Sequence, residues 1–325
     1  KDSHTIDARG ELLVPGGIDP HVHSRDPGFT HKEDWQSLCR SAHRGGVVGL
    51  VDMPNTMPPT LDMEALRLKE SIAQKTDLTY RFLMGVTADS LGALKEVFAS
   101  PPDSVCGVKV YYGRSTGNLT FSRLEELNPL GGKDHENLLF VFHSEDQCMI
   151  DKNVAKKKLG SRIIKDPKDY VIHSDVRSPE SALSSTTTIL EWAQKYNKKV
   201  HMAHISTGAE LELIAAARLK GMNVTCEVCP HHLFLSREDY PRWGSLVQVN
   251  PPLRSKEETL KLQKMSAMGM VECFATDHAP HTLEEKETTF DLASCGMIGL
   301  ESCFGAVNKV LVYQNKFKLM SLIKF

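Results

Sequence analysis

The sequence lacks several features that would assign it to a specialised class of protein. No apolar run approaches the roughly 20 residues that a membrane-spanning helix needs, so we expect no membrane partner. Neither sign of charge dominates, because 39 Lys and Arg residues against 41 Asp and Glu residues give a net charge of -2. We therefore expect no nucleic-acid partner. The eight cysteines lack the short, regular spacings of a disulfide scaffold, and we expect a reducing, cytoplasmic compartment.

The sequence is instead rich in histidine, with 14 in 325 residues. His21 and His23 follow an apolar run that has the character of a strand. Alternate side chains of a strand share one face, so the two imidazoles point the same way and provide half of a metal site. Zn²⁺ is the ion that most often takes such ligands. An isolated His-x-His more often lies on a half-exposed strand, so the rest of the chain must decide.

Eight strand-like runs alternate with helical segments over about 265 residues, which is typical of a (β/α)₈ barrel of the TIM type. The expected strands are 12–22, 47–53, 80–86, 107–112, 138–142, 199–205, 223–228 and 271–275. A doubly wound open sheet is the alternative. Polar residues follow strand after strand, namely His23, Asn55, Lys109, His143, His204 and Asp277. In a barrel these strand ends meet at one mouth, where barrel active sites lie.

Lys109 interrupts an otherwise apolar strand. An edge strand would accommodate such a lysine, but a barrel strand has no edge, and burial of an unpaired ammonium is costly. A neutral amine could instead take up CO₂ and become a carbamate, which is an anionic ligand able to bridge two metal ions.

The strand 199–205 carries two histidines of opposite parity, His201 and His204. Both cannot point inward from a regular strand. We assign His204 to the metal because it is nearer the carboxyl end, and expect His201 to pack against the helices. Glu227 is a candidate outer residue, and neither His231 nor His232 is assigned a metal.

Asp277 ends the last expected strand. A carboxylate there can bind a metal and move a proton during attack on an amide, although capping of the next helix is the commoner role. Two Zn²⁺ ions would be offset by a carbamate, Asp277 and a bridging hydroxide, which leaves a positive site. The polar rim suits a small carboxylate substrate, and its members are Arg25, Asn55, Asn250 and His281.

Together these residues resemble the metal ligands of the amidohydrolase superfamily, and the finer motifs resemble dihydroorotase. The motifs are 23–28 (HSRDPG), 30–34 (THKED), 53–59 (MPNTMPP), 227–233 (EVCPHHL), 249–254 (VNPPLR) and 277–286 (DHAPHTLEEK). The resemblance implies reversible cyclisation of N-carbamoyl-L-aspartate to L-dihydroorotate in pyrimidine biosynthesis, and a homodimer.

The resemblance also implies a role for each site residue. His21, His23 and Asp277 would bind one Zn²⁺, and His143 and His204 the other. Carboxylated Lys109 and a hydroxide would bridge the two ions. Asp277 would also move the proton, and the substrate would contact Arg25, Asn55, Asn250 and His281.

Superfamily members usually add a small β-sandwich, and residues 1–11 are expected to be a remnant of it, before a barrel domain at 12–325. Allantoinase and dihydropyrimidinase (hydantoinase) share the metal ligands and are the alternative enzymes. A catalytically inactive scaffold relative is the alternative from another class, although such relatives normally lose ligands.

Overall fold

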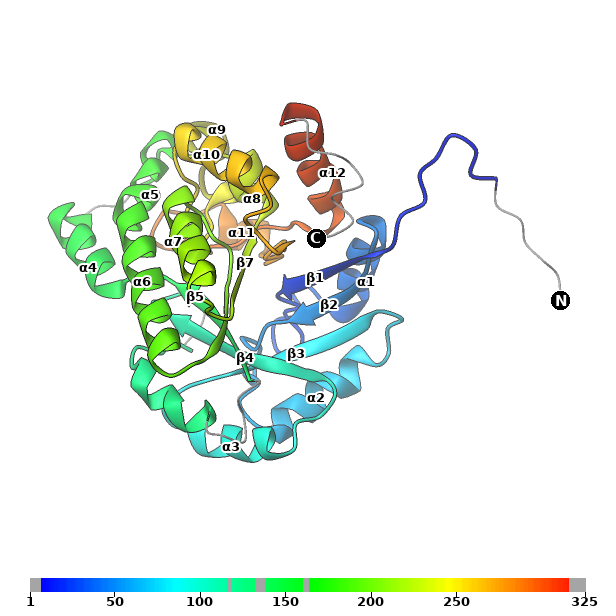
Figure 1. Cartoon of the computed structure of the whole chain (residues 1–325). Coiled ribbons are helices and arrows are strands. Elements are labelled where there is room, and N and C mark those ends of the chain that lie inside the picture. The colour runs from blue at the N-terminus through cyan, green and yellow to red at the C-terminus, as the bar shows by residue number, and fades with distance from the viewer. Residues whose placement is uncertain (1–6, 116–118, 132–137, 160–163, 316–325) are drawn as a thin grey trace.

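The computed structural model describes residues 7–115, 119–131, 138–159 and 164–315, which form a barrel of parallel strands surrounded by helices (Figure 1). Each strand pairs in parallel with the next along the chain. The strands are β1 (Gly17–Val22), β2 (Val47–Asp52), β3 (Thr79–Gly85), β4 (Val105–Tyr112), β5 (Leu139–Ser144), β6 (Lys199–Met202), β7 (Val224–Val228) and β8 (Cys273–Phe274). This order confirms the predicted (β/α)₈ barrel.

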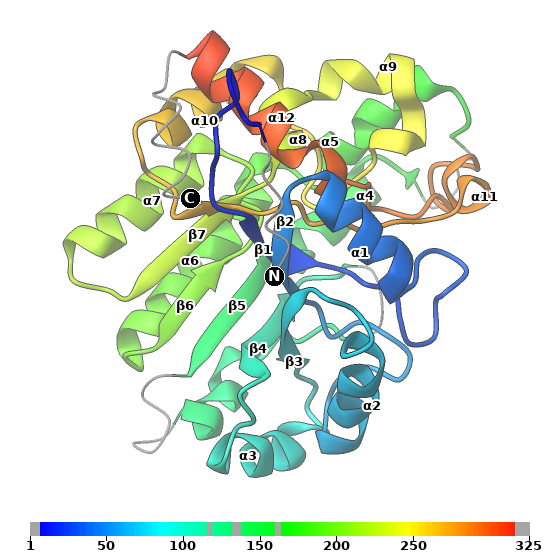
Figure 2. The same cartoon turned by 90° about the vertical axis from the view of Figure 1, so that its right-hand side faces the viewer.

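Helices cover the outside of the barrel, as the two views show (Figures 1 and 2). They are α1 (Trp35–Arg44), α2 (Met63–Ala73), α3 (Leu91–Ala99), α4 (Gln147–Lys156), α5 (Ile172–Val176), α6 (Pro179–Lys195), α7 (Gly208–Leu219), α8 (Pro230–Phe234), α9 (Tyr240–Trp243), α10 (Lys256–Ala267), α11 (Leu283–Lys286) and α12 (Cys303–Val307). Other helical turns are η1 (Leu124–Gly131), η4 (Pro167–Val171), η5 (Arg237–Asp239), η6 (Gly244–Val247), η7 (Leu300–Ser302) and η8 (Asn308–Gln314). Within the ranges described, no helix is both long and apolar enough to cross a bilayer.

The strands bury both of their faces, in two separate apolar clusters. The larger cluster lies between the strands and the helices, where Phe140 of β5 meets Trp192 of α6 edge-on at 5.4 Å between ring centroids. The smaller cluster fills the inside of the barrel and consists of Met53, Leu83, Val141 and Ala203, from four different strands or strand ends. Polar side chains on the inward face therefore lie above an apolar floor.

The barrel closes between β8 and β1 with very little strand pairing. The two are joined by a single parallel bridge between Val22 and His278, with the His23 N–H donating to the His278 carbonyl at 2.8 Å. The buried Asp19 carboxylate replaces the missing ladder, because it accepts hydrogen bonds from the backbone N–H and the hydroxyl of Thr276. The last strand, β8, has two residues rather than the five expected.

Two other elements differ from the sequence prediction in ways that shape the site. The sequence pattern predicts an amphipathic helix from about residue 32 to residue 44. The helix instead begins at Trp35, because Asp34 is its N-cap and accepts from the Ser37 N–H at 2.7 Å. Lys32 and Glu33 thus remain in the loop after β1. The strand expected to reach residue 205 ends at Met202, and His204 has a positive φ of 36°. Regular alternation therefore stops before His204.

Smaller corrections concern segment ends and loops. The first strand begins at Gly17 and not at residue 12, with Leu13 fully outside the core. The sequence predicts that Asp89 caps the helix that ends near Ala99, but the N-cap of this helix, α3, is Ser90. The composition of the segment from Pro167 to His173 predicts a mobile loop, but this segment forms η4 and the start of α5. Of the remnant expected at 1–11, residues 7–11 form no strand and residues 1–6 lie outside the described ranges.

Candidate metal centre and substrate pocket

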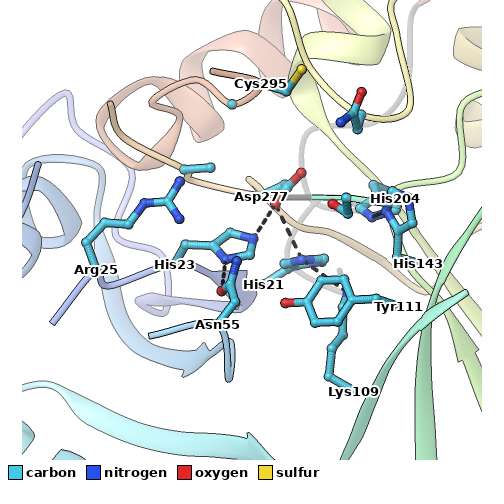
Figure 3. A pocket seen from close by; sticks show the side chains of 14 residues that line it. His21, His23, Arg25, Asn55, Lys109, Tyr111, His143, His204, Asp277 and Cys295 are labelled. Atoms are coloured by element: carbon cyan, nitrogen blue, oxygen red, sulfur yellow. Dashed lines mark hydrogen bonds and ion pairs between the residues drawn. The ribbon is translucent and has the colours of Figure 1, made fainter. Parts of the chain in front are cut away.

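The mouth of the barrel brings together all six residues predicted to bind metal (Figure 3). They line one pocket. Arg25, Asn55 and Asn250 line the same pocket. His281 is outside this lining, but its Nε2 lies 3.1 Å from Nη2 of Arg25. The structure therefore gathers every predicted site residue around one pocket.

Asp277 is the residue around which the first group of candidate metal ligands gathers. Its Oδ1 lies 3.0 Å from Nε2 of His23 and 3.4 Å from Nε2 of His21. Lys109 of β4 reaches the same point from across the barrel, with its Nζ 3.4 Å from Nε2 of His21. His204 belongs to this group too, because it can place a nitrogen within 4.8 Å of ligand atoms of His21 and Asp277.

The second group consists of His143 and His204. Nδ1 of His143 lies 3.0 Å from Nε2 of His204. On its far side, His143 contacts Glu145 through Nε2 at 3.1 Å. Both imidazoles are buried.

The hydrogen bonds behind these rings show that the residues fit a cation. Nδ1 of His21 faces the Glu227 carboxylate at 2.5 Å, and Nδ1 of His23 faces the Asn55 carbonyl oxygen at 2.6 Å. Each ring therefore carries its proton on Nδ1 and presents a lone pair from Nε2. These lone pairs point at Asp277, which is itself an acceptor. Acceptors facing one another at 3.0 Å repel unless a cation lies among them.

The pKa values of the ligands favour the metal-binding protonation states. Burial lowers the pKa of His23 to about 4, although Asp277 opposes the shift. Burial also lowers the pKa values of His143 and His204. Burial alone would raise the pKa of Asp277, but the neighbouring His21 and His23 hold it well below its usual value. At neutral pH His23, His143 and His204 are therefore neutral, and Asp277 is ionised.

Lys109 is fully buried on the inward face of β4. Burial lowers the pKa of its amine to about 8, although Glu227 and Asp277 favour the charged form. A substantial fraction of this amine is therefore neutral near physiological pH, which is the form that can react with CO₂.

Backbone strain is concentrated at this site. Five non-glycine residues have a positive φ in the described part of the chain, and three of them are Arg25 (62°), His204 (36°) and Asp277 (48°). Such conformations are costly for residues with a Cβ and persist where the surroundings impose them. In each case the turn occurs just after a strand, where it directs the side chain over the mouth.

Glu227 of β7 is a functional residue that the sequence indicated only weakly. Its Oε1 accepts from His21 and from the backbone N–H of His204 at 3.1 Å, and its Oε2 lies 3.0 Å from Nε2 of His201. The expectation that His201 packs against the helices was therefore wrong. Its Cα partner across β5 is Val141, which belongs to the interior cluster, so both side chains face inward. Glu227 of β7 thus links His21 of β1 to His201 and His204 in and just after β6.

Glu145 and Tyr111 are site residues that the sequence did not identify. The Glu145 carboxylate holds His143 and pairs with Arg177, and both side chains of that pair are largely buried. Tyr111 lies two residues after Lys109 and therefore on the same face of β4. Its buried hydroxyl has no hydrogen-bond partner among the described residues, and the ring lines the pocket. Parity with Lys109 was the signal that could have identified Tyr111.

Arg25 and His281 form a cationic edge beside the ligand cluster. Arg25 is 3 % exposed, and its Nε donates to the Pro280 carbonyl at 3.0 Å. No carboxylate lies within ion-pair distance of this guanidinium in the described part of the chain. The arrangement can bind an anionic group at one edge of the pocket while the ligand cluster acts on another part of the same molecule.

Comparison with curated proteins gives the family. A dihydroorotase from Methanosphaera stadtmanae is 32% identical over 327 residues, which covers 99% of this chain and 72% of that protein. A dihydroorotase from Carboxydothermus hydrogenoformans is 32% identical over 330 residues, with the same coverage of 99% and 72%. The chain belongs to the dihydroorotase family. Dihydroorotases are cyclic amide hydrolases with metal-dependent catalysis, and the ligand cluster of this family member fits that chemistry.

Solved structures support the fold, and no protein-family model matches the chain. An L-hydantoinase (dihydropyrimidinase) from Arthrobacter aurescens superposes with a TM-score of 0.90 at 23% identity, covering 100% of this chain and 72% of that one. A D-hydantoinase (dihydropyrimidinase) from Thermus sp. superposes with a TM-score of 0.81 at 20% identity, covering 95% and 68%. At these identities the likeness extends to the fold alone.

Proposed function

We propose that this chain is a dihydroorotase that interconverts N-carbamoyl-L-aspartate and L-dihydroorotate. The observation that carries the proposal is the buried Arg25 guanidinium beside His281, placed at the edge of a pocket whose floor is a cluster of metal-ligating side chains. A cyclic amide that bears a carboxylate matches both halves of this pocket. An uncharged ring would leave the buried guanidinium without a counter-ion.

The proposal includes two Zn²⁺ ions. His21, His23 and Asp277 would hold one, His143 and His204 the other, and a carboxylated Lys109 would bridge them. Carboxylation joins the neutral Nζ to the carbon of CO₂ and releases one proton. When bound, the ions would supply Lewis-acid activation of water and polarisation of the amide carbonyl.

The residues of the chain perform the remaining tasks. Arg25 and His281 bind the substrate carboxylate, and Asn55 and Asn250 orient the ring. In hydrolysis, water adds to the ring carbonyl carbon and the carbon–nitrogen bond breaks. The Asp277 carboxylate accepts a proton from the water and passes it to the departing nitrogen. In cyclisation the same steps run in reverse, and one water is released.

The direct test measures ring opening of L-dihydroorotate by the metal-replete protein, monitored as the change in ultraviolet absorbance of the substrate. Allantoin and dihydrouracil are assayed in parallel. We expect loss of dihydroorotate alone. Turnover of allantoin or dihydrouracil in preference would favour an allantoinase or a hydantoinase. Absence of all three activities with two metal ions bound would favour an inactive scaffold relative.

Lys109→Ala tests the bridging role in the same assay. This variant should lose most activity and bind less metal, and unchanged metal stoichiometry with unchanged turnover would contradict the role. We also propose a cytoplasmic homodimer, and sedimentation of the purified chain would test the dimer.

A further inference from the structure

His281 lies between two side chains that can only donate hydrogen bonds. Its Nε2 is 3.1 Å from Nη2 of Arg25, and its Nδ1 is 3.2 Å from Nζ of Lys32. Neither a guanidinium nor an ammonium has a lone pair to offer. A neutral imidazole has one donor and one acceptor, so it can accept from only one of these two cations. The choice of tautomer therefore decides what His281 offers to a substrate.

Each ring nitrogen also has an acceptor nearby. The Cys295 carbonyl oxygen lies 3.2 Å from Nε2, and Oε2 of Glu285 lies 3.4 Å from Nδ1. With Lys32 donating to Nδ1, the ring proton must be on Nε2. Without Lys32, Nδ1–H could donate to Glu285, and Nε2 would then accept from Arg25. That second arrangement would turn one donor of the arginine and the donor of the imidazole away from a substrate.

We propose that Lys32 is a positioning residue, which donates to Nδ1 of His281 and so holds Nε2–H ready for the substrate carboxylate beside the Arg25 guanidinium. The inference rests on the proposed function, because it takes the anion at this edge to be the carboxylate of dihydroorotate or carbamoyl aspartate.

Lys32 is itself held in place by the loop after β8. Its Nζ pairs with Oε1 of Glu285 at 2.9 Å, and the side chain of Lys32 is 12% exposed. The adjacent Glu33 contacts Nε2 of His278 at 2.8 Å. These contacts fasten the loop of residues 29–34 to the loop of residues 277–286. The two sequence motifs that contain these residues thus meet in the structure at one place.

The charges around His281 favour its neutral form. Burial, together with the cations Arg25, Lys32 and Lys286, lowers the pKa of His281 to about 3, although Glu285 opposes the shift. At neutral pH the imidazole is therefore uncharged, and its tautomer is set by its partners and not by a second proton.

The kinetic test compares Lys32→Met with Lys32→Arg in the dihydroorotase assay. Loss of a hydrogen bond to a charged group should raise KM by about 10- to 100-fold in Lys32→Met, in both reaction directions. Because the reacting amide lies elsewhere, kcat should stay within about twofold. Lys32→Arg keeps a donor and should retain a KM close to that of the wild type. His31→Gln is the matched control, since His31 belongs to the same loop and lies 3.6 Å from Glu285, whereas the hydrogen bonds of His281 are with other residues.

The spectroscopic test measures the tautomer directly. In protein labelled with ¹⁵N-histidine, the His281 signals are identified by their loss in His281→Asn. We expect a protonated Nε2 and an unprotonated Nδ1 in the wild type, and the reverse in Lys32→Met. An unchanged tautomer, or a fall in kcat without a change in KM, would overturn the inference. A wild type without dihydroorotase activity would instead overturn the proposed function, while the tautomer would still report on Lys32.

Discussion

The titration of Lys109 gives a quantitative expectation for assembly of the metal centre. Only the neutral amine can react with CO₂, so the carboxylation rate of metal-free protein at a fixed CO₂ pressure follows the neutral fraction. Burial lowers the pKa of Lys109 from 10.5 to about 8. His23, with a pKa of about 4, stays neutral throughout the relevant range, so it does not contribute to the profile.

The size of the effect follows from this pKa. For a pKa of about 8, the neutral fraction is about 1% at pH 6, about 9% at pH 7 and about 50% at pH 8. The reconstitution rate should therefore rise about ninefold from pH 6 to pH 7 and about five- to sixfold from pH 7 to pH 8. It should level off near pH 9. A lysine with an ordinary pKa would give a rate that still rises about tenfold per pH unit through pH 9.

The assay removes metal with a chelator, then adds Zn²⁺ at each pH under gas of constant CO₂ content and samples recovered activity at pH 8. Constant gas composition keeps the dissolved CO₂ fixed while bicarbonate varies. Lys109→Ala, which cannot be carboxylated, serves as the control and should recover little activity at any pH. A rate that is independent of CO₂, or one that climbs steadily through pH 9 and beyond, would refute the reasoning.

Two further predictions concern residues that support the site. Glu227→Gln should weaken metal binding by about 10- to 100-fold, because the amide cannot hold the Nδ1–H of His21 as the carboxylate does. Competition with a chelator measures the metal affinity. An unaltered affinity would show that Glu227 has no part in orienting His21. Lys69→Met should destabilise the protein by about 3–5 kcal/mol, because it leaves the fully buried Asp52 without its ion-pair partner. The urea midpoint reports that loss, and a change typical of a surface pair, under about 1 kcal/mol, would contradict it.

Strand periodicity and the polar residues at strand ends were sufficient to predict the barrel and to select the residues around its mouth. Both signals are local, since they depend on alternation within a strand and on where a strand stops. The same argument could not place His201, because β6 ends at Met202 and His204 then turns through a positive φ. A parity argument holds only while the backbone stays regular, and irregular turns are common where functional residues are held in strained conformations.

The partners of the site residues were harder to predict because they are distant in sequence. Glu227 is 206 residues from His21, and Lys32 is 249 residues from His281. No local pattern connects such residues. The quoted motifs included Glu227, Lys32 and His281, but only the folded chain shows which residues these three contact. Asp34 caps α1, and this leaves Lys32 outside the helix. An aspartate at this position is a helix-start signal that the sequence already contains.

The narrow join between β8 and β1 has a thermodynamic consequence. Arg25 extends from the loop after the first strand, and His281 from the loop after the last, so an anion held between them spans the place where the barrel has the least backbone pairing. A ligand at this point links the loops after the first and last strands, and its binding free energy adds to the stability of the closed barrel. Ligand binding should then slow the exchange of amide hydrogens near Val22 and His278 by a larger factor than it slows exchange in the well-paired β4 and β5. Ligand binding in the pocket and closure of the barrel between β1 and β8 are therefore thermodynamically coupled.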